Sequence, residues 1–435
     1  MTKLFSLQSF PRAILHIDGD CFFASCEMAK NPALRGKPII TGVERGIASS
    51  MSYEAKALGI KRGMPLHEMK KLCPDIIFVP SDYETYSLYS FRLYNIVRRY
   101  TASVEEYSID ECFAELTGMR RPLHMSYEQM AYKIKEDLDK ELGMTFSVGL
   151  APTKVLAKLA SKWKKPSGCT IIKANEIQNF LRDTDIDKIW GIGKQTTAYL
   201  RTNGIYTALE FAKKDWEWID KNMTKPHKET WKELRGELIN ELDKDKKSSY
   251  RSISKTKTFT PPSTDRSYVF SQLSKNIENA CIKARRYNLH TKKIFFFLKT
   301  QDFKYNGLEL KLSNNTNNAV DILRVIKEKF SDIFKENTPY RATGIFLLDL
   351  DEEGTQQLDL FSHQPTIERF ERLLGSLDEM AKKYGKHTVF LGSSLKAMQG
   401  AHKGERATKA SRKYELFKGE TERKRLNIPY LGLVV

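Results

Sequence analysis

The chain has 435 residues, of which 40% are hydrophobic and 29% charged, and its formal net charge is +18. This length suggests two to four domains, and no apolar run approaches the length that spans a membrane. A large positive excess opposes compaction, so it usually serves a polyanionic partner. Nucleic acid is the leading candidate, although charge alone leaves membrane surfaces and acidic proteins open.

The N-terminus and the cysteines indicate the compartment. The opening stretch MTKLFSLQSFPRAILHID lacks a signal-peptide core, so we expect no export. The cysteines, at positions 21, 26, 73, 112, 169 and 281, form neither a CxxC pair nor a zinc spacing. We interpret them as reduced, mostly buried thiols of a cytoplasmic protein.

The first predicted element is a buried strand over residues 13–17, which ends at Asp18. Residues 19–90 follow as a compact basic segment, with a strand in GKPIITGV, a helix in MSYEAKALGIKRGMP closed by Gly59 or Gly63, and a helix and strand in LHEMKKLCPDIIFVP. Tyr53 and Lys56 lie three residues apart and would share a helix face, where they could hold a triphosphate. The alternative is a solvated lysine beside a half-buried tyrosine.

Two adjacent acids, Asp110 and Glu111, lie in SVEEYSIDECFAEL, which has the aromatic and branched content of a strand pair. Side chains alternate along a strand, so the two acids converge only if the chain turns or bulges there, which predicts a hairpin tip. Adjacent carboxylates among apolar residues are costly unless a cation compensates. Oxygen ligands without His or Cys suit magnesium, and Asp18 is a further acid of this kind. The alternative is a turn at Asp18 and a solvated Glu111.

Helices are predicted in SLYSFRLYNIVRRYTASVEE and MSYEQMAYKIKEDLDKELG, on either side of the acidic hairpin. The segment MTFSVGLAPTKVLAKLASKWKKPSG then gives a strand, a helix and a Pro-Gly exit. Lys165, just before Pro166, ends this helix near the sheet, where its charge could reach a phosphate; a surface lysine is the alternative. Strand and helix units with acids on the strands predict an α+β catalytic domain.

The segment DKIWGIGKQTTAYLRTNGIYTALEFAKKD has the helix-hairpin-helix pattern of nonspecific duplex binding. Short helices flank Gly191, Ile192 and Gly193, Lys194 follows them, and a second Gly-Ile pair lies at 204–205. A glycine hairpin at a helix start exposes backbone N–H groups to a phosphate without reading sequence. The alternative is a glycine turn between packed helices.

Residues 240–255 are predicted to be a charged linker to a small basic α+β domain. Its expected strands are KTKTF, KKIFFFLK and YRATGIFLLDL, and its expected helices YVFSQLSKNIENACIKARRY and NAVDILRVIKEKF. Beyond it, EEGTQQLDLFSHQP carries apolar residues that could anchor in a pocket of a partner, although a stray apolar loop is the alternative. The stretch PTIERFERLLGSLDEMAKKYG then has the spacing of an amphipathic helix.

In this order, HIDGDCFFASCE, SYEAKALGI, EYSIDE, SVGLAPTKVLAKLA, KKPSG, WGIGK and QQLDLF resemble the Y-family of translesion DNA polymerases. The resemblance covers roughly residues 12–361. It implies an α+β multidomain, right-hand architecture: a palm over residues 1–18 and 91–178, fingers over 19–90, a helix-hairpin-helix thumb over 179–245, a little finger domain over 250–352, and a tail over 353–435.

The resemblance also implies a chemistry. Asp18, Asp110 and Glu111 match the palm carboxylates that hold two Mg²⁺ ions, with the Gly19 carbonyl as a further ligand. One ion would assist attack by the primer 3′-hydroxyl, and the other would bind the triphosphate and the leaving pyrophosphate of a dNTP. Further matches are the triphosphate contacts Tyr53, Lys56 and Lys165, the aromatic steric gate Phe23 that excludes a ribose 2′-hydroxyl, and the sliding-clamp residues Gln357, Leu358, Leu360 and Phe361.

The subtype rests on smaller features. Many relatives of the DinB (polymerase IV) type carry arginine where this chain has Lys56, which keeps the charge but loses the bidentate fork. EAKALGI, ASCE and the YGKHTVFLGSS tail are similar to the UmuC (polymerase V) type, whereas KKPSG looks more like DinB. We favour a UmuC-like member, which could require a UmuD-type accessory protein.

The predicted function is therefore a template-directed, low-fidelity DNA polymerase that copies past damaged bases on primer–template DNA. A noncatalytic polymerase-like adaptor in the damage response is the alternative from another class, and a missing palm acid would favour it. A two-metal nuclease would leave Phe23 and the nucleotide-facing lysines unexplained.

Overall fold

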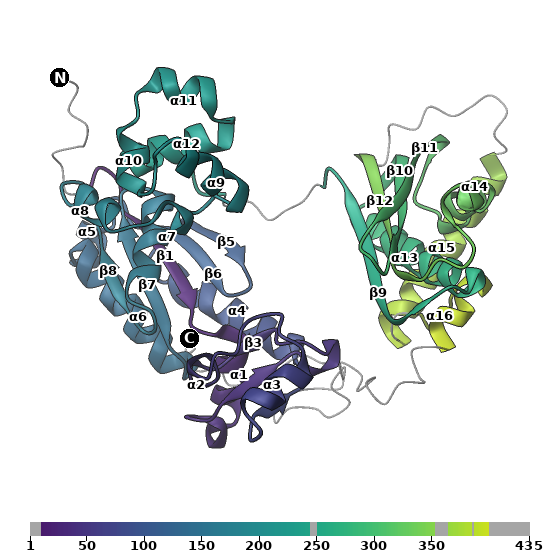
Figure 1. The fold of residues 1–435 in the computed structure, drawn as a ribbon, viewed down its shortest axis with the longest axis horizontal. Coiled ribbons are helices and arrows are strands. Elements are labelled where there is room, and N and C mark those ends of the chain that lie inside the picture. The colour runs from purple at the N-terminus through teal and green to yellow at the C-terminus, as the bar shows by residue number, and fades with distance from the viewer. Residues whose placement is uncertain (1–9, 244–249, 353–363, 385–386, 400–435) are drawn as a thin grey trace. The chain divides into compact units, whose positions relative to one another are not determined.

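The computed structural model describes residues 10–243, 250–352, 364–384 and 387–399. They form two compact units that divide between residues 245 and 246. In Figure 1 the first unit runs from purple to teal and the second from green to yellow. None of the described helices is long and apolar enough to cross a lipid bilayer. All six cysteines are free thiols, and four of them are buried, as predicted.

A five-stranded sheet forms the centre of the first unit. Its strands are β5 (Val104–Ser108), β6 (Glu111–Glu115), β1 (Ile14–Gly19), β7 (Phe146–Ala151) and β8 (Cys169–Ile171), in that spatial order. The central strand β1 is antiparallel to both neighbours, and all six of its residues are buried. The buried strand predicted before Asp18 is therefore confirmed, although it continues to Gly19. The short strand β8 is missing from the sequence-based prediction.

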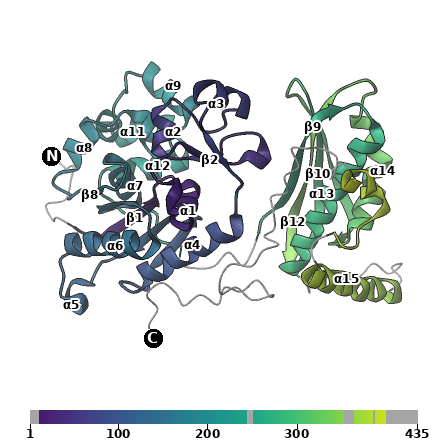
Figure 2. The ribbon, with the colours of Figure 1, turned by 90° about the horizontal axis from the view of Figure 1, so that it is seen from below.

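Helices cover both faces of this sheet (Figure 2). They are α1 (Phe22–Lys30), α4 (Tyr83–Arg98), α6 (Tyr127–Leu142) and α7 (Lys154–Trp163), with α5 (Arg120–Leu123) as a short connection. Because side chains alternate along β1, Ile14 packs with α7 while Leu15 and Ile17 pack with α4 and α6. The predicted helices around the acidic hairpin are confirmed. The boundary expected between residues 90 and 91 falls inside α4, so one continuous helix spans it.

Residues 32–79 form a smaller layer beside the end of β1. It contains the strands β2 (Ile39–Thr41), β3 (Ser50–Met51) and β4 (Ile77–Val79), the helices α2 (Tyr53–Ala57) and α3 (Leu66–Leu72), and the 3-10 turns η1 (Pro32–Leu34) and η2 (Val43–Arg45). The helix predicted at residues 51–65 is much shorter than expected. Gly59 follows it with φ +83°, a left-handed conformation that favours glycine, so the predicted closure is confirmed.

Five helices complete the first unit: α8 (Ile177–Arg182), α9 (Lys194–Thr202), α10 (Ala208–Lys213), α11 (Trp216–Asn222) and α12 (Lys225–Leu234), with η3 (Ile186–Lys188) before α9. The two Gly-Ile pairs turn the chain in the same way. Gly191 and Gly204 have φ of +91° and +73°, and the isoleucine after each is buried in the core shared with α7. The predicted helix-hairpin-helix is therefore present.

The second unit is a four-stranded antiparallel sheet, in the order β11-β10-β12-β9. Its elements are β9 (Ile253–Ser263), α13 (Arg266–Arg286), β10 (Leu289–Thr300), β11 (Tyr305–Thr316), α14 (Ala319–Ile333), β12 (Tyr340–Glu352), α15 (Gln364–Tyr384), η4 (Gly392–Ser394) and α16 (Leu395–Gln399). Every predicted element is confirmed, and β11, η4 and α16 are additions. The linker expected over residues 240–255 ends earlier than predicted, since β9 already begins at Ile253, and residues 244–249 lie outside the described residues.

Candidate active site

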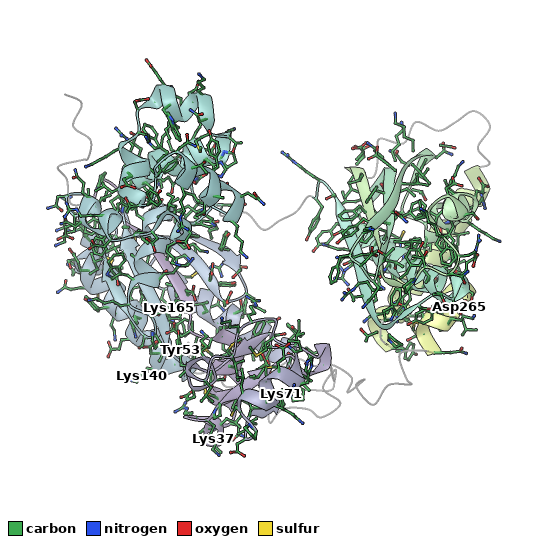
Figure 3. The ribbon with its side chains drawn as sticks, in the orientation of Figure 1. Lys37, Tyr53, Lys71, Lys140, Lys165 and Asp265 are labelled. Carbon is green, nitrogen blue, oxygen red and sulfur yellow. The ribbon has the colours of Figure 1, made fainter. Side chains whose placement is uncertain are left out.

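A cavity of about 910 Å³ opens where β1 and the β5–β6 hairpin meet the smaller layer of residues 32–79. Its lining combines acids, lysines and aromatic rings from segments far apart in the sequence. Among its lining residues are Asp18, Gly19, Cys21, Phe23, Tyr53, Lys56, Lys61, Arg62, Tyr107, Asp110, Glu111, Lys158, Lys165 and Trp190. Tyr53 and Lys165 are labelled in Figure 3, close to the lower end of the five-stranded sheet.

The backbone brings the three predicted acids to one edge of the cavity. Asp18 on β1 lies directly opposite Glu111, the first residue of β6. Asp110 occupies the turn between β5 and β6, and its carbonyl accepts a hydrogen bond from the Gly19 N–H at 2.9 Å. The hairpin tip inferred from the adjacent acids is therefore confirmed, together with a shift of register between Glu106 and Ser108.

Gly19 is required at this edge by close packing. A Cβ atom at this position would lie 2.7 Å from the ring of Phe22, which is nearer than real Cβ contacts come. Phe22 begins α1 and is buried in the core beneath the site. The glycine thus lets the strand and the helix that follows it approach each other beside the acids.

Two lysines hold the two strand carboxylates. Lys165 Nζ lies 2.5 Å from Asp18 Oδ1, and Lys158 Nζ lies 2.6 Å from Glu111 Oε2. Burial raises the pKa of Asp18, although Lys165 opposes the shift. Burial also acts to raise the pKa of Glu111, but the ammonium of Lys158 at 2.6 Å opposes it, and the net shift lowers that pKa to about 2.

His16 lies under Glu111 and is fully buried. Its Nδ1 is 2.7 Å from Ser161 Oγ, and its Nε2 is 3.7 Å from Glu111 Oε2, beyond hydrogen-bond distance. Burial lowers the pKa of His16 to about 4, with Lys158 acting in the same direction. The imidazole is therefore neutral at pH 7, and Lys158 carries the positive charge beside Glu111.

The described residues contain no group of three or more His, Cys, Asp or Glu side chains arranged so that it could hold a metal ion. The reason lies in the ion pairs, because Asp18 and Glu111 each point to a lysine, while Asp110 accepts a hydrogen bond from Ser108. The donor chemistry nevertheless suits a hard divalent cation, since all the groups are oxygens. The ammonium groups supply the compensating charge that a cation would otherwise supply.

Asp20, which no motif in the sequence singles out, connects three walls of the site. It is 1% exposed. Its Oδ1 accepts hydrogen bonds from Ser147 Oγ at 2.8 Å and from the Tyr53 hydroxyl at 3.4 Å, and its Oδ2 accepts one from the Ser167 N–H at 2.7 Å. Lys165 Nζ lies 3.7 Å from Oδ1. One buried carboxylate therefore ties β7, α2 and the loop after α7 together.

The cavity wall formed by the smaller layer is exposed and basic. Lys56 Nζ lies 4.3 Å from the centre of the Tyr53 ring, so the shared helix face predicted for these residues is confirmed. Burial and the nearby Asp20 carboxylate raise the pKa of Tyr53, which stays protonated and can donate. Lys61 and Arg62, also exposed, line the same cavity and were not singled out from the sequence.

Phe23 projects from the first turn of α1 and is half-buried. Its ring stacks on Tyr86 with centroids 4.5 Å apart and meets Tyr83 edge-on at 5.5 Å. Tyr86 is fully buried and donates to Glu27 Oε1 at 2.8 Å. The gate candidate is therefore held between a buried ring and the cavity, so a side-chain rotation would meet resistance.

The remaining predicted site residues lie elsewhere. Gly191, Gly193 and Lys194 are exposed at the hairpin before α9 and do not line the cavity, although Trp190 beside them does. Trp190 stacks on Phe113 of β6 at 5.7 Å, which connects the hairpin to the sheet. The clamp-binding candidates Gln357, Leu358, Leu360 and Phe361 lie outside the described residues.

Family comparisons agree with this geometry. Residues 17–162 match the model of the impB/mucB/samB family, residues 250–360 match the model of its C-terminal domain, and residues 174–205 match the IMS family HHH motif. The three acids therefore lie in the first matched region, whereas the glycine hairpin before α9 lies in the HHH match and the second unit in the C-terminal match. All three matches belong to one family.

Curated relatives extend over nearly the whole chain. DNA polymerase IV of Bacillus velezensis is 32% identical over 402 residues, covering 90% of this chain and 95% of the relative. DNA polymerase IV 1 of Bacillus subtilis is 31% identical over 399 residues, with the same coverage of both chains. Among solved structures, the chimera Dbh-Dpo4(243-245)-Dbh, described as a Y-family DNA polymerase, has a TM-score of 0.65 and 24% identity over 78% of this chain and 99% of its own. That likeness concerns the fold.

Proposed function

Since this chain belongs to the impB/mucB/samB family of Y-family DNA polymerases, we propose that the cavity between β1, the β5–β6 hairpin and α2 is its nucleotidyl-transfer site. The enzyme is a template-directed DNA polymerase of the translesion class, and dNTPs are its substrates. One observation carries the assignment of the site. Asp18 and Glu111 lie opposite each other on one wall, and the basic, exposed Lys56, Lys61 and Arg62 lie on another.

Catalysis in this family depends on divalent metal ions, and we propose Mg²⁺ held by Asp18, Asp110 and Glu111 with the Gly19 carbonyl. When bound, such ions lower the pKa of the attacking hydroxyl and stabilise the charge on the leaving pyrophosphate. Lys158 and Lys165 supply positive charge beside the carboxylates before the ions arrive. The low pKa of Glu111 keeps this ligand ionised over the whole working pH range.

Lys165 and Tyr53 are also proposed to bind the triphosphate of the incoming dNTP. Lys165 lies between Asp18, at 2.5 Å, and Asp20, at 3.7 Å, so its ammonium is already at the cavity edge. Tyr53 is a protonated donor at the start of α2, beside Lys56. We assign Asp20 as a positioning residue, because it fixes the loop that carries Lys165 and the hydroxyl of Tyr53 without lining the cavity itself.

Phe23 would exclude ribonucleotides. Its stacking on the buried Tyr86 leaves one side of the ring toward the cavity, so a 2′-hydroxyl would meet a side chain that cannot easily move. The hydrogen-bonded Tyr86 makes this wall more rigid than an isolated phenylalanine would be.

Two further segments are proposed to bind the macromolecular partners. The exposed hairpin at Gly191, Gly193 and Lys194 is proposed to bind backbone phosphates of the primer–template duplex. Residues 357–361 are proposed to bind the sliding clamp, and their deletion should remove clamp-dependent processivity while sparing distributive synthesis.

The polymerase IV names of the relatives favour the DinB type over the UmuC type expected from the motifs. Dependence on a UmuD-type protein stays a prediction.

Primer extension on undamaged and abasic templates, with Mg²⁺ and dNTPs, tests the proposal. The parent should extend both primers, and the double substitution Asp110→Ala plus Glu111→Ala should extend neither while still binding DNA. A parent that binds DNA but extends no primer, even with clamp and accessory proteins added, would favour the noncatalytic adaptor. Extension that survives in the double variant would refute the assignment of the acids.

A further inference from the structure

The turn between β10 and β11 presents two of the most exposed aromatic rings in the described chain. Phe303 and Tyr305 are each 60% exposed, whereas most phenylalanines of the second unit are buried or half-buried. Lone exposed rings need no explanation, but two rings gathered at one turn form a patch. The patch belongs to the second unit, whereas the residues that line the cavity belong to the first.

The backbone at Phe303 is unfavourable for the residue it carries. Its φ is +68°, in the left-handed region where glycine or asparagine is the less costly choice. The turn is otherwise well made, since the Phe303 N–H donates to the Thr300 carbonyl at 3.1 Å and the Lys304 N–H donates to Thr300 Oγ1 at 3.2 Å. A large exposed ring at this position adds strain without adding core packing, so the fold does not account for it.

Cations flank both rings. Lys299 Nζ lies 4.8 Å from the centre of the Phe303 ring and 4.5 Å from that of Tyr305. The guanidinium of Arg341, on the adjacent strand β12, lies 4.3 Å from the Phe303 ring. Lys304 pairs with Asp302 at 3.2 Å, the one carboxylate in the turn itself. The patch is therefore aromatic and positively charged. Such a patch suits a ligand that combines negatively charged groups with flat aromatic faces.

The rings continue a row on the outer face of the sheet. Helices α13 and α14 pack on the face that carries Ile294, Phe296 and Ile345. On the opposite face Tyr305 contacts Phe297 at 5.3 Å, and Phe297 contacts Phe346 at 6.2 Å. Phe297 is only 7% exposed, because its ring covers Gly344. Phe295 and Phe346 of the same row are half-buried, so Phe303 and Tyr305 at the turn are its most accessible rings.

We infer that Phe303 and Tyr305, with Lys299 and Arg341, form a stacking site for unpaired bases of a single-stranded nucleic acid. Bases of a duplex already stack on each other, so only an unpaired base offers a face to these rings. The cations would neutralise the phosphates on either side. An apolar protein partner fits less well, because lysine and arginine, rather than aliphatic side chains, surround the rings. That the strand is the DNA template rests on the proposed function.

Fluorescence titration with the full-length protein tests the site. The probe is a short single-stranded oligonucleotide with 2-aminopurine, and a blunt duplex of the same sequence serves for comparison, both without metal or dNTP. Phe303→Gly should weaken single-strand binding at least about fivefold and reduce the stacking quench, as expected for loss of one stacked base. Its midpoint of thermal unfolding should not fall, because glycine relieves the left-handed backbone. Tyr305→Ala should act similarly, and Tyr305→Phe should bind as the parent does.

Two controls separate stacking from charge and from the proposed catalysis. Arg341→Gln should lower the slope of log affinity against log salt by about one, whereas Phe303→Gly should leave that slope unchanged. Tyr132→Ala removes a similarly exposed ring from α6 and should leave both the affinity and the quench unchanged. Parent-like affinity and quench in both Phe303→Gly and Tyr305→Ala would overturn the inference and point to a protein contact instead. Because no nucleotide is incorporated, this outcome is independent of polymerase activity.

Discussion

Two carboxylate–lysine pairs join the β5–β6 hairpin to α7, and they differ only in their surroundings. Glu105 of β5 pairs with Lys154, and Glu111 of β6 pairs with Lys158 one helical turn later, both at 2.6 Å. Each ammonium also lies over an aromatic ring, Lys154 at 4.9 Å from Phe113 and Lys158 at 4.4 Å from Tyr107. The chemistry of the two pairs is therefore nearly the same.

Burial separates them. The side chains of Glu105 and Lys154 are 10% and 7% exposed, and Glu105 Oε2 accepts a further hydrogen bond from the Asp243 N–H at 2.9 Å. Glu111 lines the cavity, and 19% of its side chain is exposed. A nearly enclosed pair mainly holds the fold together, whereas a carboxylate at a cavity edge can exchange its partner for a ligand. Exposure, rather than the ion pair itself, distinguishes the catalytic candidate from its structural neighbour.

The largest stability effect should follow removal of the enclosed pair. Glu105→Gln leaves Lys154 buried without its counter-ion, so the free energy of unfolding should fall by about 3 kcal/mol. Glu111→Gln should cost clearly less, because water reaches its site. Urea denaturation of both variants measures the difference. Equal losses in the free energy of unfolding would show that burial does not distinguish the two pairs.

The pH dependence of stability should reveal the buried His16, which lies under Glu111 in the more exposed of the two pairs. The pKa of His16 is lowered from 6.5 to about 4, so between these values the unfolded chain binds a proton that the folded chain does not. Stability should therefore fall as the pH falls from about 6.5 to about 4, by on the order of 3 kcal/mol, with little further loss from this group below pH 4. Denaturation with EDTA present, at several pH values, measures this slope.

Two histidine variants identify the source of that slope. His16→Gln should flatten the dependence between pH 6.5 and 4. His67→Gln, on the exposed surface of α3, should retain it. A slope that is the same in the parent and in His16→Gln would show that another group titrates there.

A smaller effect concerns sugar selection at the cavity. Phe23→Ala removes the ring that stacks on Tyr86, so ribonucleotide insertion relative to deoxynucleotide insertion should rise roughly tenfold to a hundredfold, as relief of a steric clash of about 1–3 kcal/mol implies. Single-nucleotide kinetics with matched rNTP and dNTP give this ratio. Unchanged selectivity would remove Phe23 from its role as the gate.

The smallest change is expected for Asp20, the buried carboxylate that positions Lys165 and Tyr53. Asp20→Asn keeps the size of the side chain but weakens its hold on Ser167, Tyr53 and Lys165, so the KM for dNTP should rise about tenfold with a smaller fall in kcat. Asp20→Glu should not restore the parent values, because the longer chain does not fit a buried position. A fall in kcat alone would argue against positioning of the triphosphate.

The sequence was sufficient for the elements with strong local patterns. The buried strand before Asp18, the acidic hairpin and the helices beside it follow from apolar periodicity and from the requirement that two adjacent acids converge. The strand β11 has Leu308, Leu310 and Leu312 in alternation, which is a usable signal, but its glycine and asparagines hid it. The strand β8 is too short for any period.

The supporting residues of the site could not be predicted in the same way. Asp20 binds Ser147, Tyr53 and Ser167, which lie on three separate segments, so no local pattern reveals its role. Lys158 has the spacing of an ordinary amphipathic helix, and its partner Glu111 is 47 residues away. Only the sheet register, which sets β6 beside β1 and α7 across them, brings these groups together.

The most direct test of this account is single-turnover incorporation of one dNTP opposite an abasic site, measured side by side for Glu111→Gln and Glu105→Gln. If the cavity is the nucleotidyl-transfer site, Glu111→Gln should lose about a thousandfold in rate, since several kcal/mol of charge stabilisation disappear. Glu105→Gln, kept at a temperature where it is folded, should remain within about threefold of the parent. Comparable rates for the two variants would contradict the account, because the exposed pair would then be no more catalytic than the enclosed one.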